Sequence, residues 1–322
     1  MAAALSLALL AGCGTSGTPA PGGTTAAGAT PSAPSVALKA VTATGAVDLK
    51  TAPKVALGTT PITSTTVERK MLSPGSGAAA TVADTVSLRA QIFNGTSGKI
   101  LDDGYQAGRS AEGYRLGRAD LIAGFTEGLL GATKGSRIAF TIPPEKGFGA
   151  QGNTQLGVAP TDTIVVVADV SDVHRGLSQV DGTQTATPAG LPTVAFPNGP
   201  TKEPTVTVPK TAAPTTTKEA TLIEGKGATV VKGQTITAQY QGVLWRDGSV
   251  FDSSWQRGAA ADFPIGAGAV IPGWDKTLVG KKVGSRVLLV IPPADGYGSA
   301  GSGEKIKGTD TLVFVVDILD AY

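Results

Sequence analysis

The sequence contains a long internal repeat. Residues 142–149 read IPPEKGFG, and residues 291–298 read IPPADGYG, 149 positions later. Two shorter matches, GSR at 135–137 with 284–286 and TDT at 161–163 with 309–311, lie at offsets of 149 and 148. The units of solenoid proteins are only about 20–45 residues long, so this spacing indicates two whole homologous domains that carry small insertions.

Within the second copy the apolar residues predict strands. Ile236, Ala238 and Tyr240 alternate with polar residues, which is typical of a strand buried on one face only. The same alternation recurs from Leu312 to Ile318, and residues 287–291 form a short apolar run that ends at two prolines. Only residues 272–279 look helical, with proline in the first turn and Gly280 after the last. Each copy is therefore expected to be an α+β unit, an antiparallel sheet with one short helix.

The composition excludes several classes of function. The formal net charge is +2, and the basic residues are scattered, so we expect no nucleic acid partner. One His and one Cys leave too few ligands for a zinc site and no pair for thiol catalysis, and there is no G-x-S-x-G for a serine hydrolase. We expect neither a metal nor any other cofactor.

The first thirteen residues are typical of an export signal. An apolar run from Ala2 to Leu10 is shorter than the roughly 20 residues that a membrane-spanning helix needs, and it ends at small residues. Leu10-Ala11-Gly12-Cys13 resembles the bacterial lipobox, which predicts lipidation of Cys13 and a protein anchored to the outside of the cell membrane. Plain secretion is the alternative.

The polar segments predict the domain boundaries. Residues 14–35 consist of Gly, Ser, Thr, Pro and Ala, too few of them apolar to form a core, so residues 14–43 are expected to be a disordered tether. A second segment rich in Thr, Gly and Pro is expected to be a flexible linker with one short strand near 193–196. The predicted divisions are a signal peptide at 1–13, the tether at 14–43, a first domain at 44–174, the linker at 175–201 and a second domain at 202–322.

The motifs of the second copy closely resemble the FKBP-type peptidyl-prolyl cis-trans isomerases. The resemblance is carried by VLWRDGSVFDSS at 243–254, VIPGW at 270–274 and GYG at 296–298, in the family's order and spacing. It implies a five-stranded antiparallel sheet wrapped around one short helix in each domain. It also implies a pocket that holds a substrate proline between the sheet and the helix.

The resemblance further implies which residues form that pocket. Asp252 and Tyr297 are expected to supply polar contacts, Trp274 the floor, and the Ile271 N–H a donor to a substrate carbonyl. Each aromatic residue taken alone could be an ordinary core residue. The predicted catalytic residues are Tyr240, Phe251, Asp252, Trp274, Tyr297 and Phe314, and the predicted substrate-binding residues are Phe263, Val270, Ile271 and Ile306.

Such a pocket needs no acid, base or nucleophile. Rotation about a peptide bond is slow because resonance stiffens the C–N bond, and an apolar site that favours the twisted form accelerates it. The expected partners are proline-containing polypeptides, FK506-like macrolides and, through the lipid, a membrane. The expected function is isomerisation during the folding of exported proteins. A chaperone that binds prolyl peptides without turnover, or a structural spacer in the cell envelope, are the alternatives.

The first copy differs where the pocket should lie. Its residues at the positions of Tyr240, Phe251 and Phe314 are smaller, so its site is expected to be wider and weakly active or inactive. Asp102 and Tyr114 keep the character of their counterparts. The substituted residues are Ala90, Leu101, Phe125, Phe148 and Val166.

Overall fold

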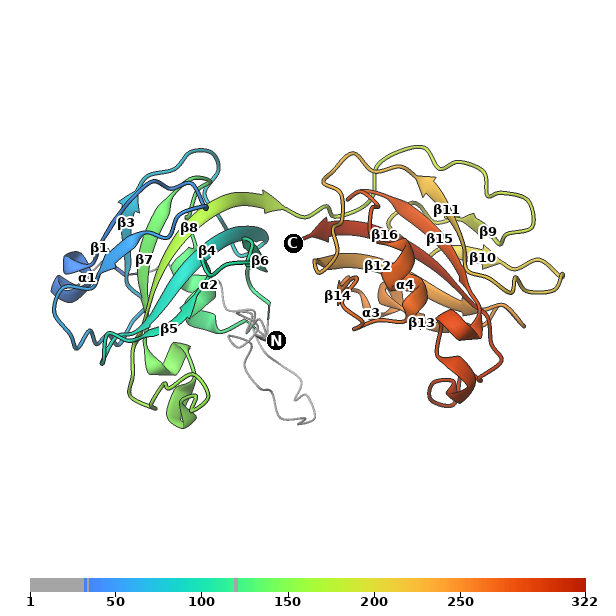
Figure 1. Ribbon diagram of the computed structural model, residues 1–322. Helices are drawn as coiled ribbons and strands as arrows, with labels where there is room; N and C mark the ends of the chain where they lie inside the picture. Colours follow the sequence, from blue (N-terminus) through green and yellow to red (C-terminus); the bar gives the residue numbers. More distant parts are fainter. Residues whose placement is uncertain (1–31, 34, 119–120) are drawn as a thin grey trace. The chain divides into compact units, whose positions relative to one another are not determined.

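The described part of the chain forms two compact units, one that ends at Arg175 and one from Gly176 to Tyr322 (Figure 1). The computed structural model describes residues 32–33, 35–118 and 121–322. Each unit contains one main antiparallel sheet and one helix packed against it, so the predicted α+β class and the tandem arrangement are confirmed.

The main sheet of the second unit has the strand order β11-β15-β16-β12-β13, and β14 also pairs with β12. β13 pairs with residues 241–243 of β12 and β14 with residues 235–238, so the two occupy one edge position in succession. The five-stranded prediction therefore holds, with its last strand interrupted by a short helix. The elements are β11 (Lys218–Ile223), β12 (Thr235–Leu244), β13 (Val250–Ser253), α3 (Ser254–Arg257), β14 (Ala261–Pro264), β15 (Arg286–Ile291) and β16 (Leu312–Ala321).

The predicted helix is α4 (Pro272–Thr277), with its proline in the first turn. Trp274 and Leu278 lie one turn apart and are both buried against the sheet. Gly273 allows the close approach, because a Cβ at this position would lie 2.6 Å from the Ile291 side chain. We call the sheet face that α4 covers the inner face.

The first unit repeats this arrangement with the order β3-β7-β8-β4-β5, and β6 also pairs with β4. Phe125 and Leu129 of its helix are buried on the inner face. Its elements are β3 (Arg69–Ser73), β4 (Asp84–Asn94), β5 (Ile100–Asp103), β6 (Glu112–Arg115), α2 (Ala123–Leu129), β7 (Arg137–Ile142) and β8 (Ile164–Arg175). Short 3-10 turns follow β7 in the first unit and β15 in the second: η2 (Pro144–Lys146), η3 (Gly149–Gln151), η4 (Pro293–Asp295) and η5 (Gly298–Ala300).

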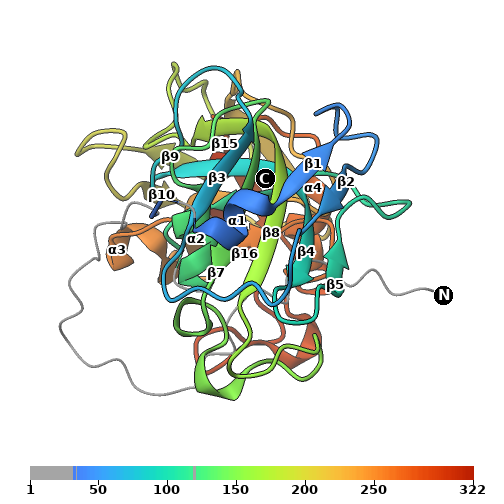
Figure 2. The ribbon, with the colours of Figure 1, turned by 90° about the vertical axis from the view of Figure 1, so that its left-hand side faces the viewer.

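In both units a preceding segment covers the outer face of the sheet. The first arm, residues 35–62, carries α1 (Val36–Ala40), β1 (Thr42–Thr44) and β2 (Lys54–Ala56), and buries Leu38 and Ile62 on the first sheet (Figures 1 and 2). The second arm, residues 180–213, carries β9 (Thr193–Ala195) and β10 (Thr205–Thr207) and packs on the second sheet. In each arm the two strands pair with each other.

The arms overturn three expectations. Strand β16 was expected to be buried on one face only, yet every residue from Leu312 to Ala321 is buried, because the second arm covers the other face. The expected tether at 14–43 ends earlier, since Leu38 and Val41 are fully buried; its residues 14–31 lie outside the described part. The expected linker at 175–201 contributes buried residues to the second unit, including Val180 and Val194. The strand predicted near 193–196 is β9.

A buried arginine anchors each arm. Arg137 donates from Nη1 and Nη2 to the Gly45 and Ala46 carbonyls, each at 2.9 Å, and pairs with Asp169. Arg286 occupies the corresponding position, pairs with Asp317 and donates from Nη2 to the Pro200 carbonyl at 3.3 Å. In both units, then, a buried arginine that is paired with an aspartate donates hydrogen bonds to carbonyls of the arm. The structural repeat therefore includes the arms and is longer than the sequence repeat suggested.

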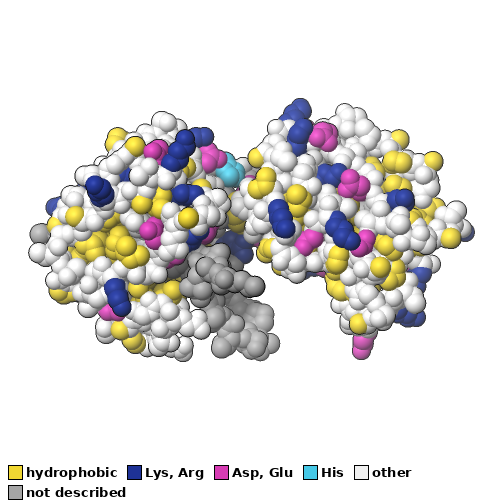
Figure 3. All heavy atoms as spheres, viewed as in Figure 1, with side chains coloured by type: hydrophobic (Ala, Val, Ile, Leu, Met, Phe, Trp, Pro, Cys, Tyr) yellow, Lys and Arg dark blue, Asp and Glu magenta, His cyan; other side chains and the backbone are white. Residues whose placement is uncertain are grey.

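The helices and the surface charge of the described residues bear on membranes and charged partners. No helix in the described residues is long and apolar enough to cross a membrane. On the face shown in Figure 3, acidic and basic side chains are interspersed rather than gathered by sign.

Candidate functional site

The aromatic residues predicted for the pocket converge on the inner face of the second sheet. They come from five elements: Tyr240 from β12, Phe251 from β13, Phe263 from β14, Trp274 from α4 and Phe314 from β16. Trp274 lies at the centre, with ring centroids 5.6 Å from Tyr240, 4.8 Å from Phe263 and 5.3 Å from Phe314. Phe251 joins through Phe314 at 5.5 Å. All four contacts are edge-to-face, the geometry that aromatic quadrupoles favour.

The remaining predicted apolar residues belong to the same cluster. Val270, Ile271 and Ile306 pack with the rings. Tyr297 is not among the residues that pack in this core: it is 41% exposed, and burial together with the charge of nearby Asp252 raises its pKa. Burial therefore increases from Tyr297, through half-buried Phe251 and Ile271, to Trp274, which is 3% exposed. We call this set the aromatic cluster.

Gly242 makes room for Phe251, a role that the sequence reading missed. A Cβ at Gly242 would lie 2.4 Å from the Phe251 ring, so the ring lies directly against the strand backbone. The first unit has Ile92 at this position, paired across the sheet with Asp102 as Gly242 is with Asp252. The sequence held a signal for this role: the second copy combines Gly242 with Phe251, whereas the first combines the larger Ile92 with the smaller Leu101.

The polar edge of the cluster contains Tyr240, Asp252 and Arg257. The Tyr240 hydroxyl donates to Asp252 Oδ2 at 2.5 Å and accepts from Arg257 Nη2 at 2.7 Å, and Arg257 also pairs with Asp252. The guanidinium lies over the Tyr240 ring, 5.3 Å from its centroid. Burial, together with the Asp252 hydrogen bond, raises the pKa of Tyr240 to about 12, so the phenol stays protonated.

Arg257 was not predicted as a site residue, because it lies on α3, a helix of four residues that the sequence reading did not detect. The signals were present but short. The Ser253 hydroxyl accepts from the Gln256 N–H at the start of α3, and Gly258 ends the helix with φ at +75°.

Two donors at the cluster have no acceptor among the described residues. The indole Nε1 of Trp274 is buried and unpaired. The Ile271 N–H, expected to meet a substrate carbonyl, lies at the start of α4 and donates to no described group. Unpaired buried donors are costly, and a ligand carbonyl would offset that cost.

The corresponding site of the first unit has a different ring at its floor. Phe125, at the position of Trp274, packs against Tyr114 at 4.9 Å and Phe140 at 5.7 Å, and both floor rings are buried, with 0% and 3% of their surface exposed. Phe140 replaces the smaller Leu289 beside this ring, whereas Leu101 and Phe148 at the edge are only partly buried, so the wider site stays a prediction. Ala90, Leu101, Val166 and Phe148 all belong to this packed core or contact it.

The edge of that site is charged. Arg109 pairs with Asp102 and Glu112, at 2.6 and 3.0 Å, and Glu112 accepts from the Tyr114 hydroxyl at 2.7 Å. Burial and the charge of Glu112 hold the pKa of Tyr114 well above its usual value. The Tyr114 hydroxyl is therefore engaged by Glu112. The position of Tyr240 is occupied by Ala90 in the first unit.

A sheet wrapped on one short helix, with an aromatic cluster between them, defines a prolyl isomerase of the FKBP class. The sequence profile of the FKBP-type peptidyl-prolyl cis-trans isomerases matches this chain twice, at residues 77–167 and 226–319. The two matches cover more than half of the chain, and each falls within one structural unit. The chain therefore belongs to this family, as its motifs predicted, and carries two such domains in tandem.

Individual relatives match one domain or both. The FK506-binding protein of Streptomyces anulatus is 45% identical over 97 residues, 30% of this chain and 78% of the relative. The peptidyl-prolyl cis-trans isomerase FKBP10 of Mus musculus is 29% identical over 230 residues, 71% of this chain, so the chain spans about a third of that protein's length. A crystal structure of AtFKBP13 is 35% identical, with a TM-score of 0.32, over 34% of this chain and 96% of that one.

Proposed function

We propose that the second unit catalyses cis–trans isomerisation of Xaa–Pro bonds at the aromatic cluster, and that it does so on exported polypeptides. The observation that carries the proposal is the convergence of four rings from four other elements around Trp274, with a partly exposed edge formed by Phe251, Ile271 and Tyr297.

The proposed chemistry is non-covalent. The rotation barrier is about 18–20 kcal/mol because the planar amide is stabilised by resonance. The planar amide is also more dipolar than the twisted one, so apolar rings in place of water disfavour the ground state relative to the transition state. The Ile271 N–H would hold the carbonyl that precedes the proline, while Asp252 and Tyr297 supply polar contacts at the edge.

The first unit is proposed to serve a non-catalytic role, in client binding or docking. Its floor ring Phe125 has no exposed surface, and Ala90, Leu101 and Val166 stand where the second unit has rings. A proline ring would find fewer aromatic walls there.

Activity on a prolyl peptide, measured without a coupled protease, tests the proposal. The full chain is expected to raise the exchange rate between cis and trans forms, followed by NMR, and an FK506-like macrolide is expected to suppress the acceleration. If the chain binds the peptide but leaves the exchange rate unchanged, it is a prolyl-peptide chaperone rather than an isomerase.

Membrane anchoring is a separate proposal that rests on the sequence at Leu10–Cys13, which lies outside the described residues. A lipid on Cys13 would place both units outside the cytoplasm, on the cell membrane. The Cys13→Ser protein is then expected to lose the acyl mass and to move from the membrane fraction to the soluble fraction. An unmodified Cys13 in the mature wild-type protein would contradict the proposal and favour secretion.

A further inference from the structure

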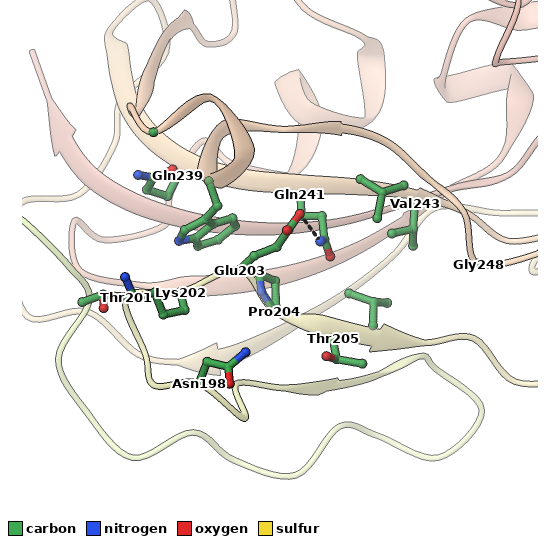
Figure 4. A pocket seen from close by; sticks show the side chains of 14 residues that line it. Asn198, Thr201, Lys202, Glu203, Pro204, Thr205, Gln239, Gln241, Val243 and Gly248 are labelled. Carbon is green, nitrogen blue, oxygen red and sulfur yellow. Dashed lines mark hydrogen bonds between the residues drawn. The ribbon is translucent and has the colours of Figure 1, made fainter.

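A cleft of about 960 Å³ lies on the outer face of the second sheet, beneath the second arm (Figure 4). Its walls come from the arm around Glu203 and from β12, where Gln239 and Gln241 face it. It shares no residue with the aromatic cluster, which lies on the inner face. The cleft is therefore a candidate for a second, independent site.

The carboxylate of Glu203 is oriented in this cleft but not neutralised. It accepts from Gln241 Nε2 at 2.7 Å (Figure 4). It also accepts from Gln256 Nε2 at 2.9 Å, and both donors are neutral amides. Within the described part of the chain no Lys or Arg nitrogen forms an ion pair with it, and the adjacent Lys202 is exposed. A half-buried carboxylate held in place by neutral donors is prepared for a cation from outside.

An indole ring lies in the same cleft. Trp255, from α3, is half-exposed and contacts Phe196 of the arm edge-on, with the centroids 6.2 Å apart. The face of an indole attracts cations, and a guanidinium stacks on it better than an ammonium does.

The first unit shows what occupies the equivalent place there. Arg89 and Tyr105 lie 150 positions before Gln239 and Trp255. Arg89 is on β4, which corresponds to β12, and Tyr105 is in the turn after β5, where the second unit has α3. The Arg89 guanidinium lies over the Tyr105 ring, 5.5 Å from its centroid, and donates to the Arg109 carbonyl. The first unit thus covers its own ring with its own arginine. The second unit has the shorter, neutral Gln239 instead, and among the described residues no cation lies over the Trp255 ring.

We propose that this cleft binds an arginine side chain of a partner polypeptide. The guanidinium would stack on Trp255, as Arg89 does on Tyr105, and donate to the free oxygen of Glu203. The proposal does not depend on the isomerase activity, because neither residue contacts the aromatic cluster.

The test uses the full chain and isothermal titration with a short proline-free peptide of Gly and Ser that carries one Arg. The matched probe carries citrulline, which keeps the shape of arginine without its charge, and a third carries Lys. The arginine peptide is expected to bind one per chain, and at least tenfold more tightly than the citrulline peptide. Equal binding of arginine and citrulline, or tighter binding of Lys, would overturn the proposal.

Three variants locate the site. Gln239→Arg should fill the cleft from within, as in the first unit, and abolish binding. Glu203→Gln keeps the shape but removes the charge, and should weaken binding by about tenfold. Glu145→Gln makes the same change on an exposed turn of the first unit and should have no effect. Unchanged binding in both cleft variants would refute the site. Prolyl exchange rates measured on the same samples should not change, which separates this proposal from that of the isomerase.

Discussion

The absence of a side chain at Gly242 determines where the Phe251 ring lies in the aromatic cluster. Gly242 leaves the space that the Phe251 ring occupies, and Ile92 fills the same space in the first unit. The ring residues could be predicted from the family resemblance, whose motifs contain Phe251 and Trp274 and fix the positions of the other rings. Gly242 and Arg257 could not, since their roles depend on contacts across β12 and α3.

Gly242→Ile tests this dependence. The larger side chain should displace the Phe251 ring and lower kcat/KM for a prolyl peptide by about tenfold or more, equivalent to about 1.4 kcal/mol or more of transition-state contact. The reciprocal variant of the first unit, Ile92→Gly, should leave kcat/KM unchanged. An unaltered kcat/KM in folded Gly242→Ile protein would show that Phe251 does not contribute to the activity.

The Tyr240 hydroxyl predicts a dependence of stability on pH. Its pKa is raised from 10 to about 12 in the folded protein, so its contribution is complete below pH 10 and is lost as the pH rises towards 12. Unfolding by urea, followed by tryptophan emission, should therefore show a steeper loss of stability over this range for the wild type than for Tyr240→Phe. All three tryptophans, Trp245, Trp255 and Trp274, belong to the second unit, so the signal reports that unit alone. Identical slopes would contradict the assigned hydrogen bonds.

At the scale of elements, the sequence did not predict that the arms would pack on the outer faces of the sheets. In the second arm the few apolar residues are separated by Thr, Gly and Pro, a composition typical of a linker. Val194 and Phe196 become informative only when the outer face of the sheet is known to need covering. The strands and the helix α4 were predictable because their apolar residues repeat at the period of each element.

The arm anchor gives a prediction of stability. Arg286→Met removes the partner of Asp317, whose pKa is already raised by burial and only partly lowered by Arg286. An uncompensated buried charge should destabilise the second unit by about 3–5 kcal/mol. The double variant Arg286→Met with Asp317→Asn should recover part of this loss. Urea unfolding measures both, and a loss below about 1 kcal/mol for the single variant would show that the pair does not anchor the arm.

At the scale of the whole molecule, the two units share a fold and differ in the side chains at the two candidate sites. The second unit has five rings on its inner face and an indole in the cleft on its outer face. In the first unit Phe140 packs against Phe125 on the inner face, and Arg89 lies over Tyr105. The fold class and the tandem organisation could be predicted from the sequence repeat. The difference between the two units could be seen only from how their side chains pack.

This difference predicts the stoichiometry of macrolide binding. Because only the second unit has the five rings of the aromatic cluster, the full chain should bind one FK506-like macrolide, and Trp274 emission should change on binding. Titration calorimetry gives the number directly. Two equivalent sites per chain would mean that the first unit binds the macrolide without those rings.

The prolyl exchange rate in a matched pair of full-length variants tests the central claim most directly. Phe251→Ala removes a ring of the aromatic cluster, and Leu101→Ala makes the equivalent truncation in the first unit. The account predicts a fall of about tenfold to a hundredfold in kcat/KM for Phe251→Ala, from the loss of about 1.5–3 kcal/mol of apolar contact, and no change for Leu101→Ala. Equal rates in the two folded variants, or a loss confined to Leu101→Ala, would contradict it.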